Sequence, residues 1–98
     1  MDAIEVVNRR EFLRPDVLQE LAVWRVPMPL RGSVHYFKYR LALVANGVCV
    51  LRYDNEAGKG DHRHVGLTEE PYVFSGARAL FADFDADVVR WIDENHSD

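Results

Sequence analysis

The sequence predicts an α+β fold: a small antiparallel β-sheet (two hairpins plus a short strand) packed by a C-terminal α-helix. Three observations support this fold: a tight turn at Asn46-Gly47 between two strand-like runs, a second pair of such runs before it, and an apolar stripe at helical spacing near the C-terminus. The 98 residues suffice for one core, so we expect a single domain over residues 1–98.

The first hairpin is expected from residues 4–13 and 17–26, which are separated by the turn-like segment 14–16. The second run is the stronger strand, since it is rich in aliphatic and aromatic residues. The first run could instead form a short helix. Pro27 and Pro29 end the hairpin, because proline cannot donate to a sheet ladder.

The second hairpin is expected from residues 34–45 and 48–53, since Asn46-Gly47 suits the positive φ angles of a two-residue turn. Successive side chains of a strand point to opposite faces, so Lys38 and Arg40 share one face with Tyr36. Cys49 lies in an apolar run and is expected in the core. As the only cysteine it can form no internal disulfide, which suits a reducing compartment.

The remaining chain is expected to hold a loop, a short strand and a helix. Residues 54–66 are polar and contain three glycines, which is typical of a loop, and residues 72–74 are expected to form the short strand. Ser75 is expected to cap the helix. Its apolar stripe comprises Ala77, Leu80, Phe81, Phe84, Val88 and Trp91, and its solvated side comprises Asp83, Asp87, Arg90 and Glu94.

Composition and charge exclude several classes of protein. With 48% hydrophobic and 29% charged residues, the chain has the composition of a globular protein, and it has no signal-peptide pattern or membrane-length apolar run. We therefore expect a cytoplasmic protein. The net charge of −4 argues against coating nucleic acid by bulk electrostatics, although residues 69–98 carry −6 and residues 1–68 carry +2.

The segment 52–64 concentrates the reactive side chains of the chain. His62 and His64 could act as the base and the acid of metal-independent RNA cleavage, because histidine can do either near neutral pH. Asp54 or Asp61 could orient an imidazole. The cations expected to hold the phosphate are Arg52, Lys59 and Arg63.

Two other interpretations of this segment stay open. His62 and His64 could bind a divalent metal, with Asp54, Asp61 or His35 completing the ligands, because two strand residues at this spacing project to one side. The segment could also be an ordinary surface turn with solvated histidines.

Several runs resemble the TumE family of toxins: residues 35–40, residues 47–51, the Arg-Tyr-Asp-Asn box at 52–55, and residues 59–64. The resemblance implies a growth-inhibiting toxin encoded beside an antitoxin, often one with a helix-turn-helix domain. Many members carry a Pro-His-His-x-His motif, so His62 and His64 match its last two histidines. Asp61 departs from that pattern.

Together, the residues and the resemblance predict a toxin that inhibits growth by metal-independent RNA cleavage or RNA binding. The alternatives are a non-catalytic binding module and a metal-dependent phosphodiesterase. We expect no cofactor, metal or membrane partner. The expected partners are an antitoxin and RNA, and the chain could form a homodimer. The expected catalytic residues are His62, His64 and Asp54, and the expected substrate-binding residues are Arg52, Tyr53, Asn55, Lys59, Arg63, Lys38 and Arg40.

Overall fold

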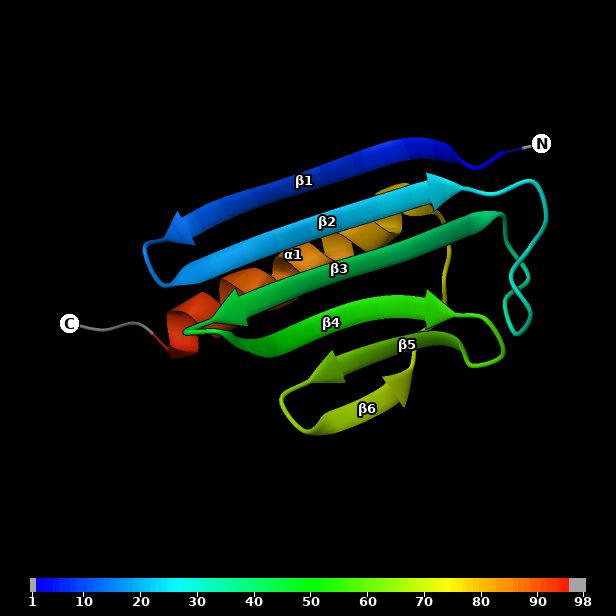
Figure 1. The fold of residues 1–98 in the computed structure, drawn as a ribbon. Coiled ribbons are helices and arrows are strands. Elements are labelled where there is room, and N and C mark those ends of the chain that lie inside the picture. Colours follow the sequence, from blue (N-terminus) through cyan, green and yellow to red (C-terminus); the bar gives the residue numbers. More distant parts are fainter. Residues whose placement is uncertain (1, 96–98) are drawn as a thin grey trace.

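The computed structural model describes residues 2–95, which form one antiparallel sheet and one helix. Neighbouring strands in the sheet are also neighbours in the sequence, so the chain runs back and forth across it in the order β1 to β6 (Figure 1). The elements are β1 (Ile4–Arg14), β2 (Val17–Arg25), β3 (Phe37–Ala45), β4 (Val48–Glu56), β5 (Gly60–Val65), β6 (Thr68–Pro71) and α1 (Ala77–Glu94).

These elements confirm the α+β class and both predicted hairpins. The first run is a strand, and Asn46 and Gly47 adopt φ angles of 51° and 78° in the second turn. The predicted loop at 54–66 is wrong, since β4 continues to Glu56 and β5 begins at Gly60. The sheet has six strands because this segment is a third hairpin.

Three smaller predictions are also wrong. The short strand lies at Thr68–Pro71, before residues 72–74, because it pairs with β5 across a tight turn. Gly76 occupies the N-cap position of α1 without a side-chain cap bond, so Ser75 does not cap the helix. Cys49 is exposed, because the register shift in the β3–β4 pairing interrupts the alternation of faces close to it.

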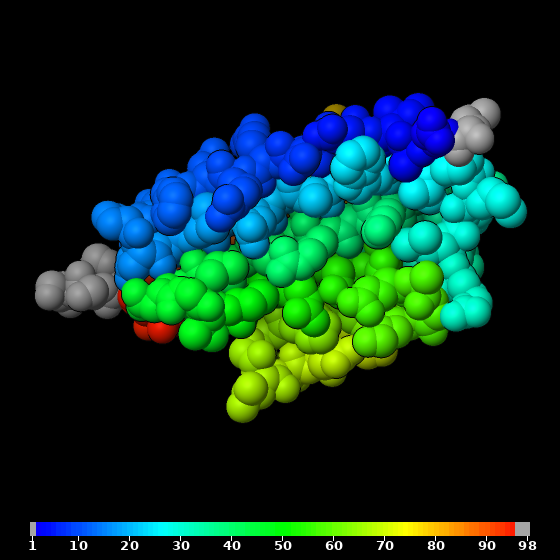
Figure 2. All heavy atoms as spheres, viewed as in Figure 1, coloured from blue at the N-terminus to red at the C-terminus, as the bar shows by residue number. Residues whose placement is uncertain are grey.

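The hydrophobic core lies between one face of the sheet and α1. Helix and sheet each bury an apolar face there, which removes apolar surface from water. Figure 2 shows the other face of the sheet, with α1 almost hidden behind the strands. The core side chains include Val17, Val23, Tyr39, Leu41, Leu43, Leu51, Tyr53, Leu80, Phe84 and Val88.

No helix among the described residues is long and apolar enough to cross a membrane.

The connection between β2 and β3 packs against the turn between β4 and β5. The Gly58 amide donates to the Arg31 carbonyl at 2.5 Å. Gly32 and Gly60 allow the two backbones to meet, because a Cβ atom on Gly60 would lie 2.8 Å from the Gly32 carbonyl oxygen. The turn that begins β5 is therefore held by a second loop.

Replacing Gly60 by alanine should destabilise the protein more than replacing Gly47. Both residues have a φ of 78°, but nothing lies within 4 Å of a Cβ placed on Gly47. Gly47→Ala should cost about 1–2 kcal/mol in the free energy of unfolding from backbone strain alone. Gly60→Ala should cost about 1–3 kcal/mol more from the clash. Equal denaturation midpoints would contradict this loop contact.

Candidate functional site

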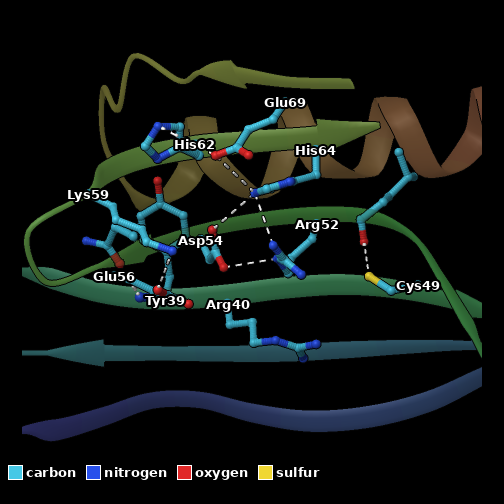
Figure 3. A network of polar contacts seen from close by, with 12 residues as sticks. Tyr39, Arg40, Cys49, Arg52, Asp54, Glu56, Lys59, His62, His64 and Glu69 are labelled. Carbon is cyan, nitrogen blue, oxygen red and sulfur yellow. Dashed lines mark hydrogen bonds and ion pairs between the residues drawn. The ribbon is translucent and has the colours of Figure 1, made fainter. Parts of the chain in front are cut away.

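The pairing of β4 with β5 creates a polar pocket on the face of the sheet that α1 leaves uncovered. Asp54 lies opposite His62 and Arg52 lies opposite His64, so alternation sends all four side chains to this face (Figure 3). The pocket has a volume of about 110 Å³. Its lining residues are Arg52, Asp54, Glu56, Lys59, His62, His64 and Glu69.

The two imidazoles converge on one position in this pocket. The Nε2 atoms of His62 and His64 each lie 3.8 Å from Oε1 of Glu69. Nδ1 of His62 lies 3.1 Å from the Gly60 carbonyl oxygen, so it carries a proton and Nε2 is free for chemistry. Both side chains are 23% exposed, which leaves them accessible to a substrate.

Arg52 contacts both a carboxylate and an imidazole. Its Nη2 donates to Nε2 of His64 at 3.1 Å, which requires an unprotonated Nε2 in this arrangement. Its Nε lies 3.0 Å from Oδ2 of Asp54, an ion pair without hydrogen-bond geometry, so this buried nitrogen has no hydrogen-bond partner among the described residues. Oδ1 of Asp54 lies 3.9 Å from Nε2 of His64.

The charges in the pocket do not favour an anion when the histidines are neutral. Two cations, Arg52 and Lys59, face three carboxylates, Asp54, Glu56 and Glu69. Lys59 is mostly exposed and lies 3.3 Å from Glu56. Protonation of one imidazole would make the numbers of positive and negative side chains in the pocket equal.

The structure brings together five of the sequence-predicted site residues and separates the others. Arg52, Asp54, Lys59, His62 and His64 line the pocket. On the same face, β3 carries two further residues of the predicted set, Lys38 and Arg40, both exposed. The face covered by α1 carries the remaining three, Tyr53, Asn55 and Arg63.

Tyr53 and Arg63 form a buried network with α1. Arg63 Nε donates to Asp87 Oδ2 at 2.7 Å and to the Tyr53 hydroxyl at 2.9 Å, and that hydroxyl donates to Asp87 at 2.5 Å. Asp87 is only 7% exposed, so its predicted place on a solvated helix face is wrong. Its burial raises the pKa, but the hydrogen bonds from Arg63 and Tyr53 outweigh burial and lower the pKa below its usual value.

Asp61 and His35 form a second network on the covered side. Nε2 of His35 lies 2.6 Å from Oδ2 of Asp61, and its Nδ1 accepts from the Phe37 amide at 3.2 Å. Asp61 also accepts from Ser33 at 2.6 Å and from Tyr39 at 2.7 Å. Asp61 therefore contacts the imidazole of His35 and not that of His62 or His64.

This placement does not support the metal-binding interpretation. Asp61 and His35 lie on the side of the sheet opposite His62 and His64, since neighbouring strand residues alternate. Across residues 2–95, no three histidine, cysteine, aspartate or glutamate side chains are grouped so that they could hold a metal ion.

Sequence reasoning missed Glu56 and Glu69 as pocket residues. Glu69 faces His64 because β6 folds back onto β5 through a turn at Gly66. The signal available was that glycine between Val65 and Thr68, which predicts a hairpin when the flanking residues are read as strands.

The fold and the pocket define a class of protein: an open antiparallel sheet backed by one helix, with paired histidines on the uncovered face. A family model described as Toxin TumE matches residues 3–92, so the chain belongs to the TumE toxin family. The resemblance is thereby confirmed, and the protein is the toxin component of a toxin–antitoxin system with a cognate antitoxin as partner. Searches of curated proteins and of solved structures gave no match.

Replacing Asp87 by asparagine should lower the free energy of unfolding by about 1.5–3 kcal/mol at neutral pH, because it weakens charged hydrogen bonds. The folded-state pKa of Asp87 is lowered, so its contribution is complete above the unfolded pKa of about 3.9 and is lost as the pH falls through the folded value. The difference from the wild type should therefore shrink below about pH 4.

The matched control is Asp85→Asn, on the same helix, where the side chain is exposed and has no hydrogen bond or ion pair within residues 2–95. Chemical denaturation across pH measures both variants. An Asp87→Asn effect no larger than that of Asp85→Asn would contradict the network.

Proposed function

We propose that this toxin inhibits growth by cleaving RNA in the cytoplasm without a metal, and that an antitoxin with a helix-turn-helix domain counteracts it. The observation that supports cleavage is the convergence of two imidazoles, each with Nε2 at 3.8 Å from one carboxylate oxygen, in a pocket that also contains Arg52 and Lys59. General acid–base catalysis of RNA cleavage needs two such groups on either side of a phosphate.

We propose different roles for the two histidines on the basis of their contacts. We assign the base to His64, whose Nε2 accepts a hydrogen bond from Arg52 and is therefore unprotonated; Arg52 releases this nitrogen as it takes the proton of the ribose 2′-hydroxyl. The 2′-oxygen then attacks phosphorus and forms a 2′,3′-cyclic phosphate as the bond to the 5′-oxygen breaks. Protonated His62 donates its Nε2 proton to that leaving oxygen.

The charged residues around the histidines support this reaction. Arg52 and Lys59 offset the negative charge that develops on the phosphate oxygens, which is where preorganised donors contribute most. Glu69 lies close enough to stabilise the imidazolium on either histidine. Asp54 holds Arg52 in place.

His62→Ala and His64→Ala should each slow cleavage of a defined single-stranded RNA in EDTA by about 100- to 10,000-fold, the usual contribution of one acid or base. Gel analysis of the products should show 2′,3′-cyclic phosphate ends for the wild type. Arg78→Gln, an exposed change on α1, should cleave normally.

Two results would contradict the proposal. Intact toxicity of both histidine variants, with no cleavage by the wild type, would indicate a binding module that acts without turnover. Cleavage that stops in EDTA and returns with a divalent cation would indicate a metal-dependent phosphodiesterase.

Glu69→Gln should slow cleavage of the same RNA, because it removes the carboxylate whose Oε1 lies 3.8 Å from Nε2 of both histidines. Glu70→Gln is the matched control, because Glu70 is the next residue on β6 but pairs with Arg63 on the other face. Equal cleavage rates for the two variants would rule out a role for Glu69.

A further inference from the structure

The histidine pocket lacks the positive charge needed to attract RNA. With neutral imidazoles its three carboxylates exceed its two cations, and a phosphodiester would add another negative charge. Nucleic-acid affinity depends mainly on lysine and arginine near the phosphates. If this site cleaves RNA, another part of the surface must supply much of the binding energy.

A neighbouring recess on β3 and β4 has the opposite balance of charge. Its volume is about 310 Å³, and its charged lining comprises three cations, Lys38, Arg40 and Arg52, and two carboxylates, Asp54 and Glu56. It shares Arg52, Asp54 and Glu56 with the histidine pocket, so the two are continuous along the uncovered face. Figure 3 shows Arg40 on the strand beside Arg52 and Asp54.

The distance between the recess and the histidine pocket suits neighbouring nucleotides of one RNA strand. Arg40 pairs with Asp54, which pairs with His62, so the three lie in a row across β3, β4 and β5. Neighbouring strands are about 4.8 Å apart, which separates the backbones of Arg40 and His62 by about 10 Å. Arg40 lies 3.5 Å from Glu20 on β2, whereas Lys38, two residues before Arg40, is exposed and forms no ion pair within residues 2–95.

An aromatic side chain lies next to this recess. Trp24 on β2 pairs directly with Lys38, so the two side chains lie side by side on the uncovered face. Trp24 is half-buried and is outside the core cluster, which leaves part of its ring accessible. An indole ring can stack on a base only when that base is unpaired, as in a single strand.

We propose that the recess of Lys38 and Arg40 binds the nucleotide next to the scissile phosphate, with its base on Trp24, and that the substrate is therefore single-stranded RNA. This inference rests on the proposed function. The lysine and arginine hold the neighbouring phosphate, and the histidine pocket holds the phosphate that is cleaved.

The test measures binding separately from cleavage. The probe is a fluorescein-labelled RNA of about 12 nucleotides, within the range of single-strand binding sites, with 2′-O-methyl groups that prevent attack by the 2′-oxygen. Lys38→Glu should weaken binding at least about 10-fold and reduce its salt dependence. Arg78→Glu makes the same change of charge at an exposed position on α1 and should change the affinity less than about 2-fold. The duplex form of the probe should bind more weakly than the single strand.

Tryptophan fluorescence tests the stacking. The chain has two tryptophans, so Trp91→Phe leaves only Trp24 and Trp24→Phe leaves only Trp91. The probe should quench the tryptophan emission of Trp91→Phe and should leave that of Trp24→Phe unchanged. Equal effects of Lys38→Glu and Arg78→Glu, duplex binding as tight as single-strand binding, or unquenched Trp24 would each overturn the inference.

The two proposals can fail independently. His62→Ala and His64→Ala should slow cleavage strongly but weaken binding of the probe less than Lys38→Glu does. If binding follows the expected pattern but the wild type cleaves no RNA, the recess stands as an RNA site and the proposed cleavage fails. If cleavage is normal but Lys38→Glu behaves like Arg78→Glu, the recess is not the neighbouring subsite.

Discussion

The register of β5 against β4 is the constraint on which the candidate site depends. It sets His62 opposite Asp54 and His64 opposite Arg52 on the uncovered face, and it sets Arg63 opposite Tyr53 on the face that packs against α1. A slip of one residue would exchange the two sets, because side chains alternate along a strand. The imidazoles would then lie against the apolar core and Arg63 would point to solvent.

Polar contacts on the covered face specify this register. Arg63 reaches Asp87 on α1 at 2.7 Å, and Asp61 reaches His35 at 2.6 Å, so the two charged residues of β5 on that face are both anchored to distant parts of the chain. A buried ion pair adds little net stability, but removing one partner is costly. The slipped register would break both anchors, which ties the shape of the open pocket to the closed side of the sheet.

Local sequence patterns predicted much of the fold, and failed where polar residues lie on both faces of a strand. The turn at Asn46-Gly47 and the apolar stripe of α1 are visible in the sequence because each has a distinct periodicity or turn chemistry. Residues 54–66 show no alternation of apolar and polar side chains, because β5 contacts α1 through the charged pair Arg63–Asp87. A polar segment without this alternation resembles a loop. The sequence identified the histidines, Arg52, Asp54 and Lys59, but it could not show that Tyr53, Asn55 and Arg63 face away from them, nor that Glu69 returns to the pocket.

The most direct test of the account is the tautomeric state of His35, His62 and His64, measured by long-range proton–nitrogen NMR above the pH at which the imidazoles are protonated. The hydrogen bonds place the proton on Nδ1 of His62 and His64, and on Nε2 of His35, where Nδ1 accepts from the Phe37 amide. Two rings of one tautomer and one of the other are therefore expected. His62 and His64 protonated at Nε2 would contradict the pocket geometry and the register that produces it.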